Sequence, residues 1–264
     1  MADSQREQGR VDYLRLSITD RCNLRCTYCM PPEGVPARAH ADILSYEELA
    51  AFARVAAGAG ISKVRITGGE PLVRLGCADF VGMLSRTSGV HDISVTTNGL
   101  LLPRYADELR RAGLSRINMS LDSLDPARFD GLSRGGRLDD ALAGLEAAFA
   151  AGFSPVKLNA LLLDGIQDEL GAFVELTRDR PLHVRFIEFM DVGASNGWRM
   201  DDVVPSAEVA RRIAEAFPIE PVDPNYPGEV AERWRYLDGQ GEIGLISSVT
   251  QPFCGSCTRA RLST

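Results

Sequence analysis

A repeated alternation of short apolar segments with amphipathic segments constrains the fold of this 264-residue chain more than any other feature. Each apolar segment is rich in β-branched residues, and a stretch with the apolar spacing of a helix follows it. The six expected strands are 11–18, 61–67, 92–97, 116–121, 156–163 and 183–189. Strands that alternate with helices favour a parallel sheet, and right-handed crossovers make a barrel its natural closure. Six units are fewer than the eight of a complete barrel, so we expect an α/β fold with a partial (β/α)6 TIM-like barrel.

Polar and glycine-containing turns follow the expected strands. They include Gly-Gly-Glu-Pro at 68–71, Thr-Thr-Asn-Gly at 96–99, Ser-Leu-Asp at 120–122 and Glu-Phe-Met at 188–190. In barrels of parallel strands, chemistry takes place at the C-terminal ends of the strands. We therefore expect these turns to meet at one rim. A capping box at Ser45 and Glu48 predicts the start of the first helix.

Three cysteines, Cys22, Cys26 and Cys29, stand together directly after the first expected strand. Thiolates select zinc, Cu(I) or iron–sulfur clusters, and closed sites normally have four protein ligands. Because no fourth cysteine lies nearby, the three could hold three irons of a [4Fe–4S] cluster and leave the fourth open to a small molecule. The alternative is a zinc knuckle completed by a distant residue.

Composition limits the classes of function. A net charge of −7 argues against a general nucleic-acid-binding surface, although it allows a local basic pocket. No apolar run approaches the ~18 residues of a membrane span, and the N-terminus carries charges where a signal peptide would be apolar. We therefore expect a cytoplasmic protein with no membrane partner. Five of the six cysteines form two tight groups, which indicates reduced metal ligands, whereas the isolated Cys77 is expected to be a small buried hydrophobe.

The C-terminal part lacks the strand–helix alternation of the expected barrel. Residues 218–228 contain four prolines and are expected to be a linker, followed by two strands at 233–237 and 242–249. A second cysteine pair, Cys254 and Cys257, comes after them. We accordingly divide the chain into a disordered N-terminus (1–10), a partial barrel (11–217), and a linker with a short β extension and an incomplete second-cluster segment (218–264).

The C-x3-C-x2-C spacing, with an aromatic residue before its third cysteine, resembles the signature of the radical S-adenosylmethionine (SAM) superfamily. That resemblance implies a partial barrel whose open iron binds the methionine part of SAM. Taken alone, Gly-Gly-Glu-Pro is only a tight turn in which glycine lets the backbone approach a ligand. The resemblance implies that Gly69 and Glu70 contact the methionine, that Tyr28 and Met190 lie on the adenine side, and that Ser120 makes a polar contact to SAM.

Further motifs narrow the resemblance. Thr-Asp-Arg at 19–21, Met-Pro at 30–31, Val-Arg-Ile-Thr at 64–67 and the C-terminal Cys-x2-Cys-Thr-Arg-Ala-Arg are similar to the GTP 3′,8-cyclases of molybdenum cofactor biosynthesis. The similarity runs over nearly the whole chain. It implies a second [4Fe–4S] cluster on Cys254 and Cys257, whose open iron binds the guanine of GTP. The two clusters would face each other across the barrel.

A triphosphate requires fixed cations, which Arg and Lys supply. A positive charge on a strand that points into a barrel also needs a partner. The positions that match GTP contacts of the family are Arg15, Arg65, Thr96, Lys157, Arg259 and Arg261, and the last two are also expected to be catalytic.

The resemblance implies a lyase reaction. A 5′-deoxyadenosyl radical removes the 3′ hydrogen of GTP, and the C3′ radical adds to C8. Uptake of one electron and one proton then gives (8S)-3′,8-cyclo-7,8-dihydroguanosine 5′-triphosphate. It also implies a reductant protein and a downstream cyclic pyranopterin monophosphate synthase as partners. The oligomeric state stays open, a homodimer included.

One departure from the family pattern is a third C-terminal cysteine, which would fall beyond Thr264. We therefore expect the chain to be a fragment, with an incompletely ligated second cluster. Two alternatives stay open. A radical SAM peptide maturase with an auxiliary cluster would lack the Thr-Arg-Ala-Arg run and affinity for GTP. A noncatalytic electron carrier would have four cysteines per cluster and no glycine-rich turn.

Overall fold

The computed structural model describes residues 11–36, 42–178, 180–191, 197–226 and 228–263, so the expected disordered segment 1–10 lies outside the described residues. The strands are β1 (Tyr13–Ser17), β2 (Lys63–Thr67), β3 (Asp92–Thr97), β4 (Arg116–Ser120), β5 (Val156–Leu162), β6 (Leu182–Glu188), β7 (Ile219–Val222), β8 (Glu232–Tyr236), β9 (Glu242–Ile246) and β10 (Arg259–Ser263). The helices are α1 (Tyr46–Gly58), α2 (Cys77–Ser85), α3 (Leu102–Ala112), α4 (Pro126–Ser133), α5 (Leu138–Ala150), α6 (Leu170–Arg178) and α7 (Ser206–Ala216).

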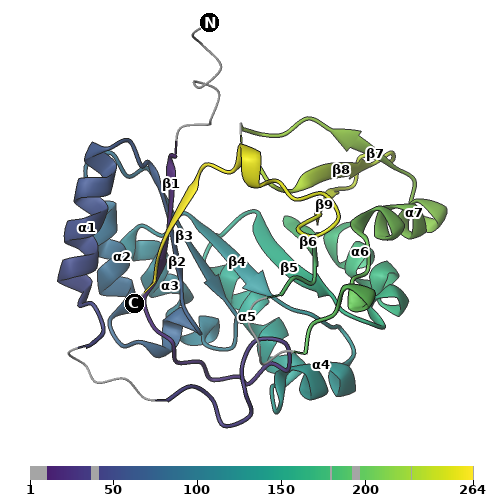
Figure 1. Ribbon diagram of the computed structural model, residues 1–264, viewed down its shortest axis with the longest axis horizontal. Coiled ribbons are helices and arrows are strands. Elements are labelled where there is room, and N and C mark those ends of the chain that lie inside the picture. The colour runs from purple at the N-terminus through teal and green to yellow at the C-terminus, as the bar shows by residue number, and fades with distance from the viewer. Residues whose placement is uncertain (1–10, 37–41, 179, 192–196, 227, 264) are drawn as a thin grey trace, which may run out of the picture.

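All of these strands belong to one sheet, in the order β10-β1-β2-β3-β4-β5-β6-β9-β8-β7. The strands from β10 to β9 run parallel, whereas β8 and β7 are antiparallel. The sheet curves with helices along its outer side, and β10 lies beside β1 (Figure 1). The expected α/β fold with a partial, unclosed barrel is confirmed.

The two faces of the sheet differ in chemistry. On β1, Leu14 and Leu16 are buried in the apolar core, and Val64 and Ile66 match them on β2. The residues between them are polar and form the opposite face. Parallel sheets covered by helices on both sides have nearly continuous apolar strands. Alternation is found here because helices cover only the outer face, which leaves a polar concave face for a ligand.

Two features of the C-terminal part differ from expectation. Residues 218–228, expected as a linker, include β7, which pairs with β8 at the edge of the sheet. An edge strand tolerates a proline such as Pro221, since only one side of its backbone is hydrogen-bonded to the sheet. The Arg-Ala-Arg run forms β10, a parallel partner of β1. The division of the chain at residues 217 and 218 stays a prediction.

The start of α1 follows the sequence prediction. Ser45 accepts a hydrogen bond from the backbone N–H of Glu48, and the Glu48 side chain accepts one from the backbone of Ser45. These contacts satisfy two N–H groups that have no partner within the helix. No helix in the described part of the chain is both long enough and apolar enough to span a membrane.

Candidate functional site

The cysteine loop, residues 22–30, begins just beyond β1 at the C-terminal edge of the sheet. The backbone N–H groups of Cys29 and Met30 both donate to the carbonyl of Cys26, at 3.1 and 3.0 Å. This turn brings the thiols of Cys26 and Cys29 within hydrogen-bonding reach of each other. Cys22 Sγ accepts from the backbone N–H of Leu24 at 3.4 Å.

The arrangement of the loop's three thiols bears on the kind of metal site that they could form. Within the described ranges, no three His, Cys, Asp or Glu side chains are gathered around a single metal position. A cluster takes one thiolate per iron, so its ligands need not converge on one point. The contact with Cys26 lowers the pKa of the Cys29 thiol, and burial raises the pKa of Cys22. Cys29 is therefore the thiol that deprotonates most readily.

The Gly68-Gly69 turn packs against the backbone that precedes the cysteine loop. A Cβ on Gly69 would lie 2.3 Å from the carbonyl oxygen of Arg21, and one on Gly68 would lie 2.5 Å from that of Thr19. Gly69 N donates to the Thr19 carbonyl at 2.7 Å. The two glycines were expected to let the backbone approach a ligand, and here they let it approach another part of the protein's own backbone. This contact joins the turn after β2 to the segment that leads into the cysteine loop.

Glu70 is 1% exposed, and both its carboxylate oxygens have donors. Oε1 accepts from Leu72 N at 3.0 Å and from Thr97 Oγ1 at 2.8 Å, and Oε2 accepts from Asn98 N at 2.7 Å. Burial raises the pKa of Glu70 despite these hydrogen bonds. The carboxylate holds the turn after β2 to the end of β3, and its expected contact with SAM stays a prediction.

Tyr28 links the cysteine loop to the end of β4. Its hydroxyl donates to Asp122 Oδ2 at 2.5 Å, and Asp122 Oδ1 accepts from Leu161 N at 2.8 Å. Burial, followed by the charge of Asp122, raises the pKa of Tyr28 well above its usual value. Ser120 ends β4 at the same edge, and Met190 follows β6 with 45% exposure. The residues expected around SAM therefore share one rim.

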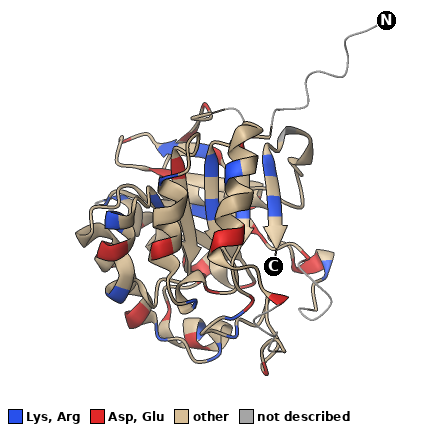
Figure 2. Ribbon diagram, turned by 90° about the vertical axis from the view of Figure 1, so that its left-hand side faces the viewer, with Lys and Arg blue, Asp and Glu red and all other residues tan. Residues whose placement is uncertain are grey.

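A row of cations crosses the polar face. Arg261, Arg15 and Arg65 are direct neighbours in the register of β10, β1 and β2. Figure 2 shows Lys and Arg on adjacent strands, including β10, which leads to the C-terminus. Burial, followed by the charges of Arg65 and Arg261, lowers the pKa of Arg15 to about 10. These side chains repel one another, so an anion between them would be stabilised.

Polar atoms on this face are buried without hydrogen-bond partners among the described residues: Tyr13 Oη, Arg15 Nε, Thr96 Oγ1 and Asn118 Oδ1. Buried polar groups are normally hydrogen-bonded, and an exception calls for an explanation. Tyr13 and Arg15 lie on β1, within the cation row, and Thr96 and Asn118 lie on β3 and β4 beside it. The donor set therefore fits a polar, anionic ligand within the curve of the sheet.

A second group of polar residues lies in the next row, where Thr96, Asn118 and Lys157 are neighbours on β3, β4 and β5. Burial, followed by the charges of Arg185 and Arg116, lowers the pKa of Lys157 to about 7. The sequence analysis did not select Asn118, Arg116 or Arg185. The same polar–apolar alternation that places Arg15 on this face would have identified all three.

The two cysteine groups lie at opposite ends of the sheet. Tyr13 pairs with Arg259 and Ser17 with Ser263, so β10 runs in the direction of β1. Cys254 and Cys257 precede β10 and therefore lie at the N-terminal edge, whereas the cysteine loop follows β1. Burial raises the pKa of Cys257, but hydrogen bonds from Arg259 outweigh it and lower the net value.

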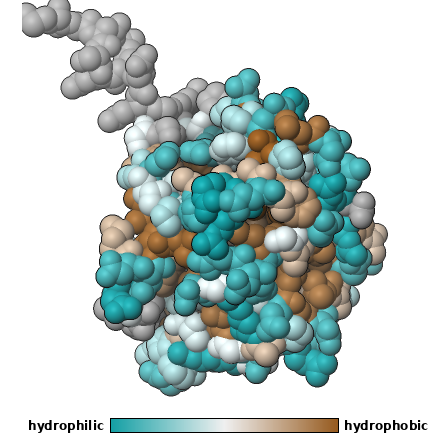
Figure 3. All heavy atoms as spheres, turned by 90° about the vertical axis from the view of Figure 1, so that its right-hand side faces the viewer, coloured by the Kyte–Doolittle hydropathy of each residue, from teal (hydrophilic) through white to brown (hydrophobic). Residues whose placement is uncertain are grey.

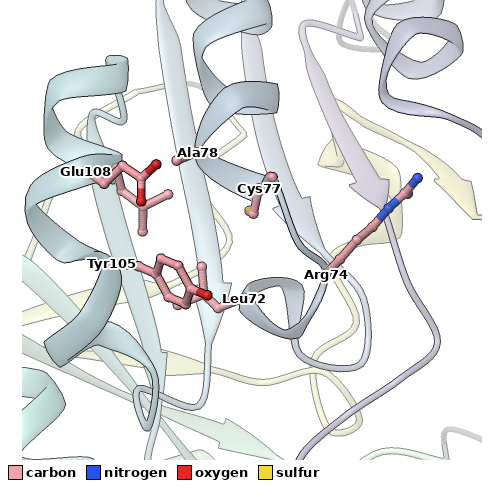
Figure 4. Close-up of a pocket in the computed structure, with 8 residues that line it drawn as sticks. Leu72, Arg74, Cys77, Ala78, Tyr105 and Glu108 are labelled. Carbon is pink, nitrogen blue, oxygen red and sulfur yellow. The ribbon is translucent and has the colours of Figure 1, made fainter.

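Two of the hollows that lie outside this face adjoin α2 and α3, and α6 and α7, respectively. One, of about 40 Å³, is lined by Leu72, Cys77 and Tyr105 among others (Figure 4). Cys77 is 6% exposed and its pKa is raised to about 12 by burial, which confirms the expected small buried hydrophobe. The other, of about 540 Å³, lies beside Phe217 and Leu237. The face bearing α6, α7 and β7 mixes apolar and hydrophilic side chains (Figure 3). None of the expected site residues lines either hollow.

Two family models match the chain: the Radical SAM superfamily over residues 16–177 and Molybdenum Cofactor Synthesis C over residues 182–264. The radical SAM superfamily implies a [4Fe–4S] cluster and SAM. The three thiols of the cysteine loop, one per iron, fit such a cluster, since thiolate is its usual ligand.

Solved structures agree on the fold. Streptococcus suis SuiB bound to precursor peptide SuiA superposes with a TM-score of 0.66 at 16% identity, covering 78% of this chain and 45% of SuiB. Methylornithine synthase (PylB) gives a TM-score of 0.60 at 20% identity, covering 73% of this chain and 58% of PylB. The chain thus spans less than two thirds of each. At these identities the likeness concerns the fold alone.

Sequence relatives are much closer. The GTP 3′,8-cyclase of Acidothermus cellulolyticus is 52% identical over 259 residues, which are 95% of this chain and 71% of the relative. The proteins of that name from Geobacter sulfurreducens and Alkaliphilus oremlandii are 47% and 44% identical, with 96% of this chain and 78% of each relative covered. With both family models and these relatives in agreement, the chain belongs to the radical SAM superfamily and, within it, to the GTP 3′,8-cyclase family.

Proposed function

We propose that this protein is a radical SAM lyase that converts GTP to (8S)-3′,8-cyclo-7,8-dihydroguanosine 5′-triphosphate, the first step of molybdenum cofactor biosynthesis. The observation that carries the proposal is the cationic concave face between the two cysteine groups. The five residues of β1 are joined by four steps of ~3.3 Å, so the two edges lie about 13 Å apart, which leaves room for a nucleotide along the strands.

The cysteine loop would hold the first cluster through Cys22, Cys26 and Cys29. When bound, the cluster supplies the electron that cleaves SAM to methionine and a 5′-deoxyadenosyl radical. The residues assigned to SAM are Tyr28, Gly69, Glu70, Ser120 and Met190. Their place at one rim supports this assignment, because a ligand held there has the interior of the sheet directly beside it.

The cation row, together with Lys157 in the next row, would bind the triphosphate. Arg15, Arg65 and Lys157 have pKa values lowered by burial, so an anionic partner repays part of the cost of burying their charges. Thr96 Oγ1 supplies a buried hydroxyl without a partner among the described residues. The chain's contribution is to fix the nucleotide, to orient its ribose, and to exclude water from the reacting atoms.

Arg259 and Arg261 would serve the reacting end of GTP as catalytic groups. They lie on β10, directly after the second cysteine pair. Cys254 and Cys257 would contribute to a second [4Fe–4S] cluster near the guanine. The match of residues 182–264 to Molybdenum Cofactor Synthesis C supports this part of the proposal.

The proposal also includes the partners of the enzyme and its compartment. The enzyme would take electrons from a reductant protein and pass its product to a cyclic pyranopterin monophosphate synthase in the cytoplasm. All six cysteines are free thiols in the structure, in keeping with a reducing compartment. A homodimer is compatible with this assignment and is not required by it.

A radical SAM peptide maturase is the competing candidate, since the structures of SuiB share the fold. Its support is weaker, because identity is 16% to SuiB bound to its peptide and 44–52% to three of the GTP 3′,8-cyclases. A row of neighbouring arginines, two of them half-buried, also suits a triphosphate better than a peptide of unspecified charge.

Anaerobic reconstitution with iron and sulfide, followed by dithionite reduction and SAM, tests the proposal. We expect 5′-deoxyadenosine by chromatography, with more formed when GTP is present and with a GTP-derived product of unchanged mass. Formation that GTP does not increase would contradict the substrate assignment. An intact cluster that yields no 5′-deoxyadenosine would contradict the reaction class.

A further inference from the structure

The cysteine loop rests on the C-terminal end of α4, more than 100 residues away in sequence. The backbone N–H of Arg25 donates to the carbonyl of Ser133 at 3.1 Å, and that of Thr27 donates to the carbonyl of Leu132 at 2.9 Å. The last carbonyls of a helix have no partner within the helix. Here the loop supplies the missing donors, so the end of α4 serves as its support.

Arg134, the residue directly after α4, returns hydrogen bonds to the same loop. Its Nη1 donates to the Met30 carbonyl at 3.0 Å and to the Arg25 carbonyl at 3.3 Å. These two carbonyls bracket Cys26 and Cys29 in the sequence. One guanidinium thus joins the two ends of the segment that carries the second and third thiols.

The backbone of Arg134 has an unusual conformation. Its φ is +53°, and among the described residues it is the one non-glycine residue with a positive φ. A left-handed conformation costs a non-glycine residue roughly 1 kcal/mol, and glycine would occupy this position without that cost. Gly135, next in the chain, has a φ of +105°. An arginine at a position that favours glycine indicates that its side chain is used.

Arg25 complements this arrangement from within the loop. Its Nη1 donates to the carbonyls of Cys22 at 2.7 Å and Leu24 at 2.9 Å. Its side chain packs on Gly34, where an added Cβ would come within 2.9 Å of Nε. Two guanidinium groups therefore hold four carbonyl groups of the loop, which fixes the backbone before any metal is bound.

We propose that Arg134 is a positioning residue for the first cluster: it clamps the cysteine loop to the end of α4 and adds a positive charge beside the thiols. This inference rests on the proposed function only in assigning the cluster to this loop. The clamp itself is a property of the cluster-free chain. A cation near a cluster stabilises the reduced, more negative state, so the same residue raises the reduction potential.

The first test is hydrogen–deuterium exchange of the cluster-free protein. Arg134→Gly suits it, because glycine keeps the left-handed backbone and removes only the side chain. We expect peptides covering residues 22–30 to exchange about tenfold faster in this variant, the effect of losing a charged hydrogen bond. The melting temperature should stay within about 2 °C of the wild type, since the change is at the surface.

Arg137→Ala is the matched control. Arg137 lies three residues further on, its side chain is 73% exposed, and its ion pairs are with Asp139 and Asp140. We expect no change of exchange in residues 22–30 in this variant. Unchanged exchange in Arg134→Gly, or an equal change in Arg137→Ala, would overturn the clamp.

The second test measures the midpoint potential of the reconstituted cluster by an EPR-monitored titration. Arg134→Gly should shift the potential to a more negative value. Arg134→Lys should restore it, because lysine keeps a positive charge at this position. Equal potentials in all three proteins would overturn the electrostatic part. Failure of the wild type to take up any cluster, with the exchange difference intact, would contradict the proposed function and leave the clamp standing.

Discussion

Lys157 holds the buried charge that responds most directly to pH. Burial, with help from the guanidinium groups of Arg185 and Arg116, lowers its pKa from 10.5 to about 7. Because the folded pKa lies below the unfolded one, the unfolded chain binds more protons between pH 7 and pH 10.5. The contribution of Lys157 to the free energy of unfolding therefore rises with pH in that window, and an anion would reverse the shift.

Anion binding should therefore be coupled to proton uptake. At pH 8 most Lys157 side chains are neutral without ligand, and a bound triphosphate should raise the pKa of Lys157 and recharge it. We expect GTP or inorganic tripolyphosphate to take up a substantial fraction of one proton. Calorimetric titration in two buffers of different ionisation enthalpy measures this uptake. Lys157→Met should abolish most of it, and a wild-type titration independent of buffer would refute the coupling.

At the scale of elements, buried carboxylates tie the rim of the sheet together. Three acidic residues stand at or just beyond the ends of alternate strands β2, β4 and β6: Glu70, Asp122 and Glu188. Each accepts a backbone N–H near the C-terminal end of the neighbouring strand. Asn98 and Val249 follow β3 and β9, and Leu161 is the penultimate residue of β5. Each carboxylate thus joins the C-terminal ends of two neighbouring strands, which holds the loops at this edge in fixed relative positions.

The contact between the glycine turn and the cysteine loop is equally specific. Gly69→Ala would place a Cβ against backbone atoms of Arg21, which cannot move as a side chain can. We expect it to lower the free energy of unfolding by about 1–3 kcal/mol, the usual cost of overpacking. Urea denaturation measures the change.

Gly171→Ala is the control for that variant, because a Cβ on Gly171, in α6, has no heavy atom within 4 Å. Alanine should stabilise this helix by about 0.5 kcal/mol. Equal stability of Gly69→Ala and the wild type would show that the turn can move away from the loop.

Local sequence patterns predict most helices and strands, whereas contacts between residues far apart in the sequence decide which further segments become strands and which side chains meet. The six β/α units follow from apolar periodicity, and the helix at Ser45 follows from its capping box. β10 was not expected, because Arg-Ala-Arg becomes a strand only through its pairing with β1. Similarly, the hydrogen bonds of Glu70 to Leu72, Thr97 and Asn98 could not be predicted, because no sequence pattern tells which donors a buried carboxylate will meet after folding. Its expected contact with SAM stays a prediction.

In the molecule as a whole, the charged groups on the concave face lower the free energy of unfolding. Arg15 is flanked by Arg65 and Arg261 in the sheet, and its Nε has no hydrogen-bond partner among the described residues. Desolvating like charges together opposes folding. The apolar core between the sheet and the helices offsets this cost, so the concave face can remain prepared for an anion.

Replacing one of these cations should raise the stability of the ligand-free protein and weaken its binding of anions. Arg15→Met keeps a long, flexible side chain without the charge, and we expect its melting temperature to rise by about 2–4 °C in the absence of ligand. The stabilisation by tripolyphosphate should fall below that of the wild type. Arg111→Met, at an exposed position of α3, should change neither quantity. A lower melting temperature for Arg15→Met would argue against strain in the cation row.

The pairing of β10 with β1 also sets an order of events during synthesis on the ribosome. The cysteine loop and α4, which supports it, have both been made once residue 134 is added. β1 must wait about 130 residues longer for its partner, or roughly 6–26 s at 5–20 residues per second. The nascent chain thus completes the support of the cysteine loop while the free edge of β1 still waits for β10, so the first and the tenth strand of the sheet pair long after the loop between β1 and α1 has been made.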